Sequence, residues 1–214
     1  LMAPRLMLGT YEETEIELIN KIPDIKNMNV LELGGCLGIL SVLVNKKLNN
    51  PENHIVVEAN PKAIKYLEHN KELNQCKFKI ENAMISSRSN GVFFSYDKIV
   101  AGSAHRIDNA ERNETKHIIE VMTLKELMDK YKILFDLIIV DIEGGELEFF
   151  EDVGDIDVSY ILVELHENLM YPGFNRRCMD LLESRGMILV DEFAKGCALY
   201  KNQKTSKENN DCIR

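Results

Sequence analysis

Four side chains that can exchange protons or bind a metal lie at the ends of two apolar runs. Asp141 and Glu143 follow the run "LIIV", and Glu164 and His166 stand in "VELHEN". Carboxylates and imidazole serve as general bases in many enzymes, and carboxylate oxygens also bind Mg²⁺. If the two runs are neighbouring parallel strands, their carboxyl ends meet at the edge where ligands bind. We therefore expect a reaction centre there, with Asp141, Glu143 or His166 as the base and Glu164 against the substrate.

Each of these residues also has a structural interpretation. Glu143 could be a carboxylate that stabilises the N-terminus of the following helix, and His166 could be a hydrogen-bonded histidine at a strand end. A metal-free centre is the first expectation. The alternative is one Mg²⁺ held by Asp141 together with Glu164 or His166, where it would acidify a bound hydroxyl.

A glycine cluster, "ELGGCLG", interrupts the apolar sequence near the N-terminus. A parallel strand that ends in glycines and leads into a helix presents backbone N–H groups at the ligand-binding edge of the sheet. The spacing is not that of a dinucleotide fingerprint, because Gly34 and Gly35 are adjacent and Cys36 stands where the second glycine belongs. The pattern is Glu32-x-Gly34-x-x-x-Gly38, which predicts a ligand cradle. A tight strand-to-helix turn is the structural alternative.

Two carboxylates near this turn suit a ligand that carries an amine and a ribose. Glu32 precedes the turn and could meet a cationic amine directly or through water. Glu58 ends the next apolar run, "VVEAN", where its carboxylate could accept both ribose hydroxyls in a contact of roughly 1.5 to 3 kcal/mol. Glu58 by itself could also be a solvated charge at a strand end. An adenosine linked to an α-amino acid fits the pair.

The elements that must position these residues alternate between strands and helices, which predicts a doubly wound α/β domain. A first helix is expected from Thr10, with a capping box to Glu13, and a later one from Pro61 with Asn60 as its cap. Strands are expected at 29–33, 54–60, 76–83, 135–145 and 158–167, and two more within 186–202 joined through residues 195 and 196. The other helices are expected at 37–48, 123–131, 146–152 and 172–185.

Length and composition are those of one globular domain, because the 214 residues are 45% hydrophobic and 29% charged. We expect a single domain over 1–214. Within it, 1–28 is an N-terminal helical segment, 84–120 an insertion near the active site with a hairpin and a long loop, and 202–214 a polar tail.

The net charge and the cysteine spacing indicate which partners and which cellular compartment to expect. A net charge of −9 with scattered basic residues disfavours nucleic acid as a partner. Five cysteines without C-x-x-C spacing fit reduced thiols in the cytoplasm rather than disulfides or a zinc site. No apolar run is long enough for a membrane span, and the first residues do not read as a secretory signal.

Several separated motifs carry a resemblance to a known family. From about Val30 to Tyr200 the chain resembles the FkbM-like branch of the class I S-adenosylmethionine-dependent methyltransferases. "ELGGCLG" matches its acidic-x-Gly-Ala-Asn-x-Gly motif with Gly35 for alanine and Cys36 for asparagine, and "VVEANP" and "VMTLKEL" are similar to two others. The most diagnostic match is "DIEGGE", which is similar to Asp-x-Glu-Gly-x-Glu.

The resemblance implies a Rossmann-like, mostly parallel seven-stranded sheet with an antiparallel last strand, and S-adenosylmethionine as cofactor. Cys36 departs from the family pattern, which leaves a side-chain contact at that position open. The cofactor contacts that the resemblance implies are Glu32, Gly34, Gly35, Cys36, Gly38, Glu58, Asn60, Asn82, Ala83 and Asp141.

The absence of three known motifs disfavours several classes of methyl acceptor. The Asp/Asn-Pro-Pro-aromatic pattern of amino-group methylation, the fifth-strand lysine of ribose methylation and the Pro-Cys of C5 pyrimidine methylation are all missing. We expect O-methylation of a sugar, glycan or small metabolite. His105, Arg106 and Tyr171 would contact this acceptor, although the first two could belong to an ordinary polar loop and Tyr171 to the packing of the next helix. RNA or protein methylation, an NAD-binding oxidoreductase and a catalytically silent adenosyl-binding module are the alternatives.

Overall fold

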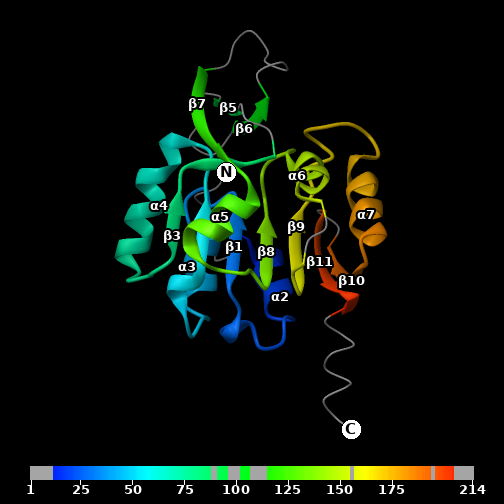
Figure 1. Ribbon diagram of the computed structural model, residues 1–214, viewed down its shortest axis with the longest axis horizontal. Coiled ribbons are helices and arrows are strands. Elements are labelled where there is room, and N and C mark those ends of the chain that lie inside the picture. The colour runs from blue at the N-terminus through cyan, green and yellow to red at the C-terminus, as the bar shows by residue number, and fades with distance from the viewer. Residues whose placement is uncertain are drawn as a thin grey trace.

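The main feature of the molecule is a seven-stranded sheet (Figure 1). The computed structural model describes residues 12–87, 91–95, 102–106, 115–154, 157–193 and 196–204. The strand order is β10-β11-β9-β8-β1-β2-β3, and β11 is antiparallel to both neighbours while the other pairs are parallel. The predicted doubly wound fold with its antiparallel last strand is confirmed. The strands are β1 (Val30–Leu33), β2 (His54–Val57), β3 (Lys79–Glu81), β8 (Leu137–Val140), β9 (Tyr160–Glu164), β10 (Met187–Glu192) and β11 (Cys197–Asn202).

Helices cover both faces of this sheet, which is why the central strands are apolar without alternation. All four residues of β1, β2 and β8 are buried. One face packs against α2 (Glu13–Ile19), α3 (Ile39–Asn45) and α4 (Pro61–Leu73), and the other against α5 (Leu124–Tyr131), α6 (Glu146–Val153) and α7 (Phe174–Ser184). Two short 3₁₀ helices, η1 (Ile25–Asn27) and η2 (Pro51–Asn53), precede β1 and β2.

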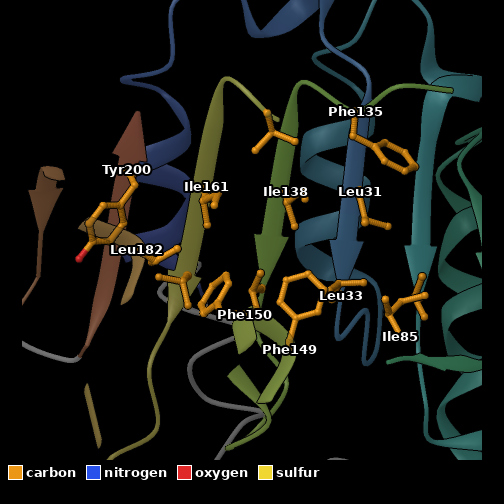
Figure 2. Packing of buried hydrophobic residues seen from close by; sticks show 14 of the residues in the cluster. Leu31, Leu33, Ile85, Phe135, Ile138, Phe149, Phe150, Ile161, Leu182 and Tyr200 are labelled. Carbon is orange, nitrogen blue, oxygen red and sulfur yellow. The ribbon is translucent and has the colours of Figure 1, made fainter. Parts of the chain in front are cut away.

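The larger core cluster lies between the sheet and α5 to α7. Figure 2 shows Leu31, Ile138 and Ile161 from three adjacent strands in this cluster with Phe149 and Phe150 of α6. The arrows of β1 and β8 point the same way in this view, so the segments that follow them reach the same edge of the sheet. This geometry brings the glycine turn after β1 next to the acidic turn after β8.

Two helix starts test the capping predictions. Asn60 caps α4 as expected, because its side-chain oxygen accepts a hydrogen bond from the backbone N–H of Lys62 at 3.0 Å. The first helix begins at Glu13 and not at Thr10, so the predicted capping box is wrong. Glu12 is the N-cap residue, with φ of 56° and no side-chain cap hydrogen bond, and Thr10 lies outside the described residues.

The strand expected over 76–83 is divided in two. β3 ends at Glu81, and β4 (Ala83–Ile85) leaves the main sheet to pair with β7 (Thr115–Met122). β7 also pairs with β5 (Gly91–Ser95), and β5 forms an antiparallel hairpin with β6 (Gly102–Arg106). The resulting four-stranded sheet has the order β4-β7-β5-β6, and Figure 1 shows β5 to β7 beyond one end of the main sheet. Among the described helices, none has the length and apolarity needed to cross a bilayer.

Candidate active site

The glycine turn after β1 packs tightly against both neighbouring strands. The N–H groups of Gly34 and Gly35 donate to the carbonyl oxygen of Val57 at 2.9 and 3.3 Å. Gly34 has φ of +93°, and a Cβ there would lie 1.6 Å from the carbonyl oxygen of Asp141, while a Cβ on Gly35 would lie 2.3 Å from Val56 Cγ1. These glycines are therefore required by contacts within the chain, whether or not a ligand also lies against them.

Cys36 occupies a backbone conformation that suits asparagine better than cysteine. Its φ is +45°, in the left-handed region that Asn tolerates more readily than most residues, which explains an asparagine at this place in the family motif. The contribution of Cys36 here is its backbone N–H, which donates to Glu58 Oε2 at 2.6 Å. Burial, together with the Glu58 charge, raises the pKa of the Cys36 thiol to about 12, so the thiol is not a nucleophile at neutral pH.

Glu58 links the glycine turn to the loop after β2. One carboxylate oxygen accepts the N–H of Cys36, and the other accepts the N–H of Asn60 at 2.6 Å. Burial raises the pKa of Glu58, and these two hydrogen bonds oppose that rise. Because each carboxylate oxygen has two lone pairs, Glu58 retains acceptor capacity for a ribose.

Glu32 lies deeper than the sequence suggested. Its carboxylate accepts a hydrogen bond from Ser41 Oγ at 2.6 Å and lies 3.0 Å from His54 Nε2, and Glu32 is only 3% exposed. Its partners come from α3 and β2, so Glu32 joins three elements inside the layer beneath the turn. This position gives the carboxylate no direct access to a ligand amine.

Asn82 and Ala83 mark the point where the chain leaves the main sheet. Asn82 Nδ2 donates to the carbonyl oxygens of Glu58 and Ala59 at 2.7 and 3.2 Å. The side chain thus holds the end of β3 against the loop after β2. Asn82 is exposed, whereas Ala83 is buried at the start of β4. Of the two, Asn82 is the residue with a surface at the edge of the cradle.

The strand ends after β8 and β9 bring Asp141, Glu143 and His166 together. His166 Nδ1 forms a hydrogen bond with Glu146 Oε1 at 2.8 Å, and Glu146 is fully buried at the start of α6. The same oxygen accepts the N–H of Gly144 at 3.0 Å. His166 Nε2 consequently faces Asp141 Oδ1 at 3.5 Å and Glu143 Oε2 at 3.6 Å.

The electrostatics of this cluster follow from several acids around one imidazole. Burial lowers the pKa of His166, but the hydrogen bond and charge of Glu146 and the charges of Asp141 and Glu143 outweigh it and raise the pKa to about 9. Burial and the Glu164 charge hold the pKa of Asp141 well above its usual range, against the effect of His166. Asp141 Oδ1 is buried and has no hydrogen-bond partner among the described residues.

Backbone strain is concentrated at the same turn. Glu143 has φ of +53° and Gly144 has φ of +102°, so the chain reverses sharply between β8 and α6. A left-handed conformation at a non-glycine residue costs about 1 to 2 kcal/mol. Glu143 therefore occupies a strained position beside Asp141.

The sequence analysis did not identify Glu146 as a site residue, although it is the last acid of "DIEGGE". Glu146 is the first residue of α6, and the motif does not reveal that its side chain turns back to His166. Glu12 and Glu15 were also missed. Both come from the N-terminal segment around α2 and act electrostatically on Glu164 or Asp141. No motif marked them as part of this site.

Comparison with known proteins places the chain in a family. The family model described as the methyltransferase FkbM domain matches residues 39–189, which is more than half of the chain. The chain belongs to the FkbM methyltransferase family. It is accordingly an S-adenosylmethionine-dependent methyltransferase. The matched region begins at residue 39, directly after the glycine turn, and does not include the turn. The role of that turn is therefore argued from its geometry alone.

Solved structures of other methyltransferases share the fold of this FkbM domain. A ribosomal protein L11 methylase from Lactobacillus delbrueckii subsp. bulgaricus has 11% sequence identity and a TM-score of 0.53, with 91% of this chain and 79% of that chain covered. A precorrin-6y C5,15-methyltransferase from Geobacter metallireducens has 11% identity and a TM-score of 0.52, with coverage of 88% and 84%. An O-methyltransferase from Bacillus cereus, solved in complex with SAH, has 12% identity and a TM-score of 0.52, with coverage of 89% and 81%. No curated protein matches the chain at a significant level.

The FkbM domain has a hollow of about 560 Å³ at the loop between β9 and α7. Met170, which lines it, packs against Gly144 of the acidic turn. Tyr171, a predicted acceptor contact, lines it and packs against Phe174 in a T-shaped arrangement with ring centroids 5.6 Å apart. His105 and Arg106 lie on β6, but their side chains are outside the described part of the structure. Further residues that line the hollow are Leu165, Glu167, Asn168, Met170 and Asn175.

The carboxyl of Glu164 predicts a pH dependence of the stability of this FkbM domain. Burial and the neighbouring Glu15, which also hydrogen-bonds to it, raise the pKa of Glu164 from 4.5 to about 7. The folded chain thus keeps a proton there that the unfolded chain releases at lower pH, so this contribution to stability is present below pH 4.5 and is lost as the pH rises through 7.

The free energy of unfolding should fall between pH 5 and pH 8, and Glu164→Gln should make this fall smaller by about 1 kcal/mol. The expected difference is only this large because solvent screens part of the effect. Urea denaturation at both pH values measures this loss. The matched control is Glu151→Gln, which changes a half-exposed acid on α6 paired with Arg177. An equal pH dependence in wild type, E164Q and E151Q would show that Glu164 titrates as an ordinary surface acid.

Proposed function

We propose that the protein transfers the methyl group of S-adenosylmethionine to a hydroxyl oxygen of a sugar, a glycan or another small polar metabolite. The observation that carries this proposal is the convergence of Asp141, Glu143 and His166 at the ends of β8 and β9. Transfer to a hydroxyl needs a group that accepts the hydroxyl proton, and an ionised Asp141 or Glu143 is able to do so. His166, whose pKa is raised to about 9, already holds its proton at neutral pH and acts by placing that charge beside the two acids.

The reaction is an in-line displacement at the methyl carbon. The bond between carbon and the sulfonium sulfur breaks while the bond to the acceptor oxygen forms, and the sulfonium becomes a neutral thioether. The hydroxyl proton passes to a carboxylate of the cluster, Asp141 or Glu143. Most of the catalysis comes from holding the two reactants in line, and the buried hydrogen bond between Glu146 and His166 keeps one member of the cluster in a defined orientation.

The cofactor would lie along the carboxyl edge of β1, β2 and β3. Glu58 fits the ribose, because its carboxylate is held at the strand end by two backbone N–H groups and retains acceptor lone pairs. The exposed Asn82 lies next to it, on the side expected for the adenine. Glu32 would act only indirectly, by holding α3 and His54 beneath the turn.

The hollow suggests the acceptor class. Its lining includes the polar residues Asn168, Asn175 and Glu167 together with Tyr171 and the apolar Met170. Asn175 Oδ1 and Glu167 Oε2 each accept the backbone N–H of the other residue, which fixes both side chains at the rim. Amide and carboxylate groups hydrogen-bond to hydroxyls, and an aromatic ring packs against the carbon face of a polyhydroxylated ring. The acidic cluster and the net charge of −9 disfavour polyanions.

Titration calorimetry with S-adenosylmethionine, S-adenosylhomocysteine and NAD tests the cofactor. We expect binding of both sulfur ligands and none of NAD. Glu58→Gln should weaken the sulfur ligands by about tenfold, because a charge-assisted contact to ribose is lost, while Glu151→Gln should leave them unchanged. Binding of NAD alone would overturn the cofactor and the reaction together.

Transfer of labelled methyl groups to a panel tests the acceptor. The panel contains sugars, oligosaccharides, small polyols, total RNA and a protein extract. We expect label in the hydroxyl compounds. Label confined to RNA or protein would replace the proposed acceptor class, and cofactor binding without transfer to any member would indicate a silent adenosyl-binding module.

A further inference from the structure

One donor atom each from Asp141, Glu143 and His166 converges on the same place at the ends of β8 and β9. One ligand atom from each residue lies within 4.8 Å of the other two. The distances from His166 Nε2 to Asp141 Oδ1 and Glu143 Oε2 are 3.5 and 3.6 Å, longer than a good hydrogen bond. A small divalent cation holds its ligands at about 2.0 to 2.3 Å, which separates neighbouring ligand atoms by about 3 Å and opposite ones by about 4 Å. The two distances from His166 Nε2 lie within this range.

Two atoms at this centre lack the partners that buried polar atoms normally have. The side chain of His166 is only 10% exposed, and its Nε2 makes no hydrogen bond within the described residues, only the two long contacts to carboxylates. Asp141 Oδ1 is buried and likewise without a hydrogen-bond partner among the described residues. Both atoms point toward the same space, so one occupant would satisfy both.

The second ring nitrogen of His166 forms the kind of hydrogen bond that is common at metal sites. A metal-binding histidine usually donates its second ring N–H to a carboxylate or carbonyl, which fixes the ring and the free nitrogen. Glu146 provides this contact from a fully buried position, and the Gly144 N–H holds the same oxygen. The orientation of His166 Nε2 is thus set by the fold and not by the two carboxylates in front of it.

The charge around the centre also favours a cation. Asp141, Glu143 and Glu146 surround one imidazole, and Glu164 adds a further acid close to Asp141. Even with a charged imidazole the acidic groups outnumber the basic ones at this strand edge, so the cluster attracts cations. A divalent ion would offset this excess at the place where the unpartnered atoms converge.

We propose that Asp141, Glu143 and His166 bind one divalent cation of the Mg²⁺ or Mn²⁺ type, which carboxylate-rich sites prefer. Three protein ligands leave further coordination positions open for an acceptor. The remaining part rests on the proposed function: a hydroxyl acceptor with a second oxygen on the adjacent carbon would chelate the cation, which lowers the pKa of the hydroxyl and aims its oxygen at the methyl carbon. The hydroxyl proton would pass to the second carboxylate oxygen of Asp141 or Glu143, since each residue offers the cation one ligand atom. Vicinal diols are then the preferred acceptor class.

Mn²⁺ titration followed by electron paramagnetic resonance tests the site without any turnover. The full chain is first treated with a chelator and dialysed. We expect one bound Mn²⁺ per chain below about 1 mM free Mn²⁺, and at least tenfold weaker binding in Asp141→Asn and His166→Gln. Glu146→Gln should weaken it by about tenfold through the orientation of His166. The control Glu151→Gln should bind as wild type, and circular dichroism confirms that each variant is folded.

Pulsed resonance on the bound Mn²⁺ supplies a second readout, which needs no comparison of affinities. We expect a nitrogen coupling from one imidazole in the wild type and in E151Q. The absence of Mn²⁺ binding, or binding without that nitrogen coupling, would overturn the proposal. The result is independent of the cofactor test, because a chain that binds Mn²⁺ but no S-adenosylmethionine would refute only the proposed reaction.

Discussion

Replacing Gly34 by alanine is expected to lower the free energy of unfolding by more than about 3 kcal/mol. The added Cβ would lie 1.6 Å from the backbone oxygen of Asp141, and φ at this position is +93°. Backbone cannot move aside like a flexible side chain, so β1 and β8 must separate where their parallel pairing ends. Urea denaturation monitored by circular dichroism measures the loss, and a Gly34→Ala chain that does not fold at all meets the same expectation.

Gly186→Ala is the matched control for this substitution. Gly186 has a similar φ of +83°, but a Cβ there meets nothing within 4 Å. It therefore carries only the left-handed backbone cost of about 1 to 2 kcal/mol. If G34A and G186A lose equal stability, the close approach of the glycine turn to Asp141 is not what requires glycine at position 34.

Asp141→Asn is expected to lower the rate of methyl transfer about 10³-fold while the affinity for S-adenosylmethionine changes less than about threefold. The amide keeps the shape of the side chain but cannot accept a proton or offer an anionic ligand. Asp141 is the acid whose Oδ1 is buried without a hydrogen-bond partner among the described residues, 3.5 Å from His166 Nε2. Initial rates with the best acceptor of the panel and calorimetry with the cofactor give the two quantities.

Glu151→Gln on α6 is the control for this pair of measurements and should retain both. A D141N chain that loses cofactor affinity and rate in parallel would place Asp141 in the cofactor site, which the sequence motif also allows. Unchanged transfer in D141N would remove Asp141 from the chemistry, and with it the proton-accepting cluster at the ends of β8 and β9.

The sheet and most of its helices could be predicted because each depends on local burial. "LIIV" and "YILV" are apolar without interruption, and such runs form strands that are covered on both faces. The helix from Pro61 to Leu73 followed from Asn60 and Pro61 alone, since a cap and a first-turn proline act within one turn. The helix expected from Thr10 begins instead at Glu13, and no residue caps it in the way that the capping box predicted.

The direction of individual side chains could not be predicted in the same way. Glu32 and Glu58 have similar settings in the sequence, each at or near the end of an apolar run. Yet Glu32 bonds to Ser41 and His54 inside a layer, while Glu58 binds backbone N–H groups at the strand end. Alternation along a strand decides which face a residue takes, and only the packing of α3 decides what it meets there.

The sequence by itself determined the fold class, the glycine turn and the set of acids in "DIEGGE", because these depend on short-range patterns of burial and backbone freedom. The tertiary structure alone decided that Glu146 holds His166 from behind, that Asp141 and Glu143 face its free nitrogen, and that the acids around α2 act on the same edge. The physical reason is that charge and hydrogen bonding act over a few ångströms in space, between residues whose separation along the chain carries no signal of that contact.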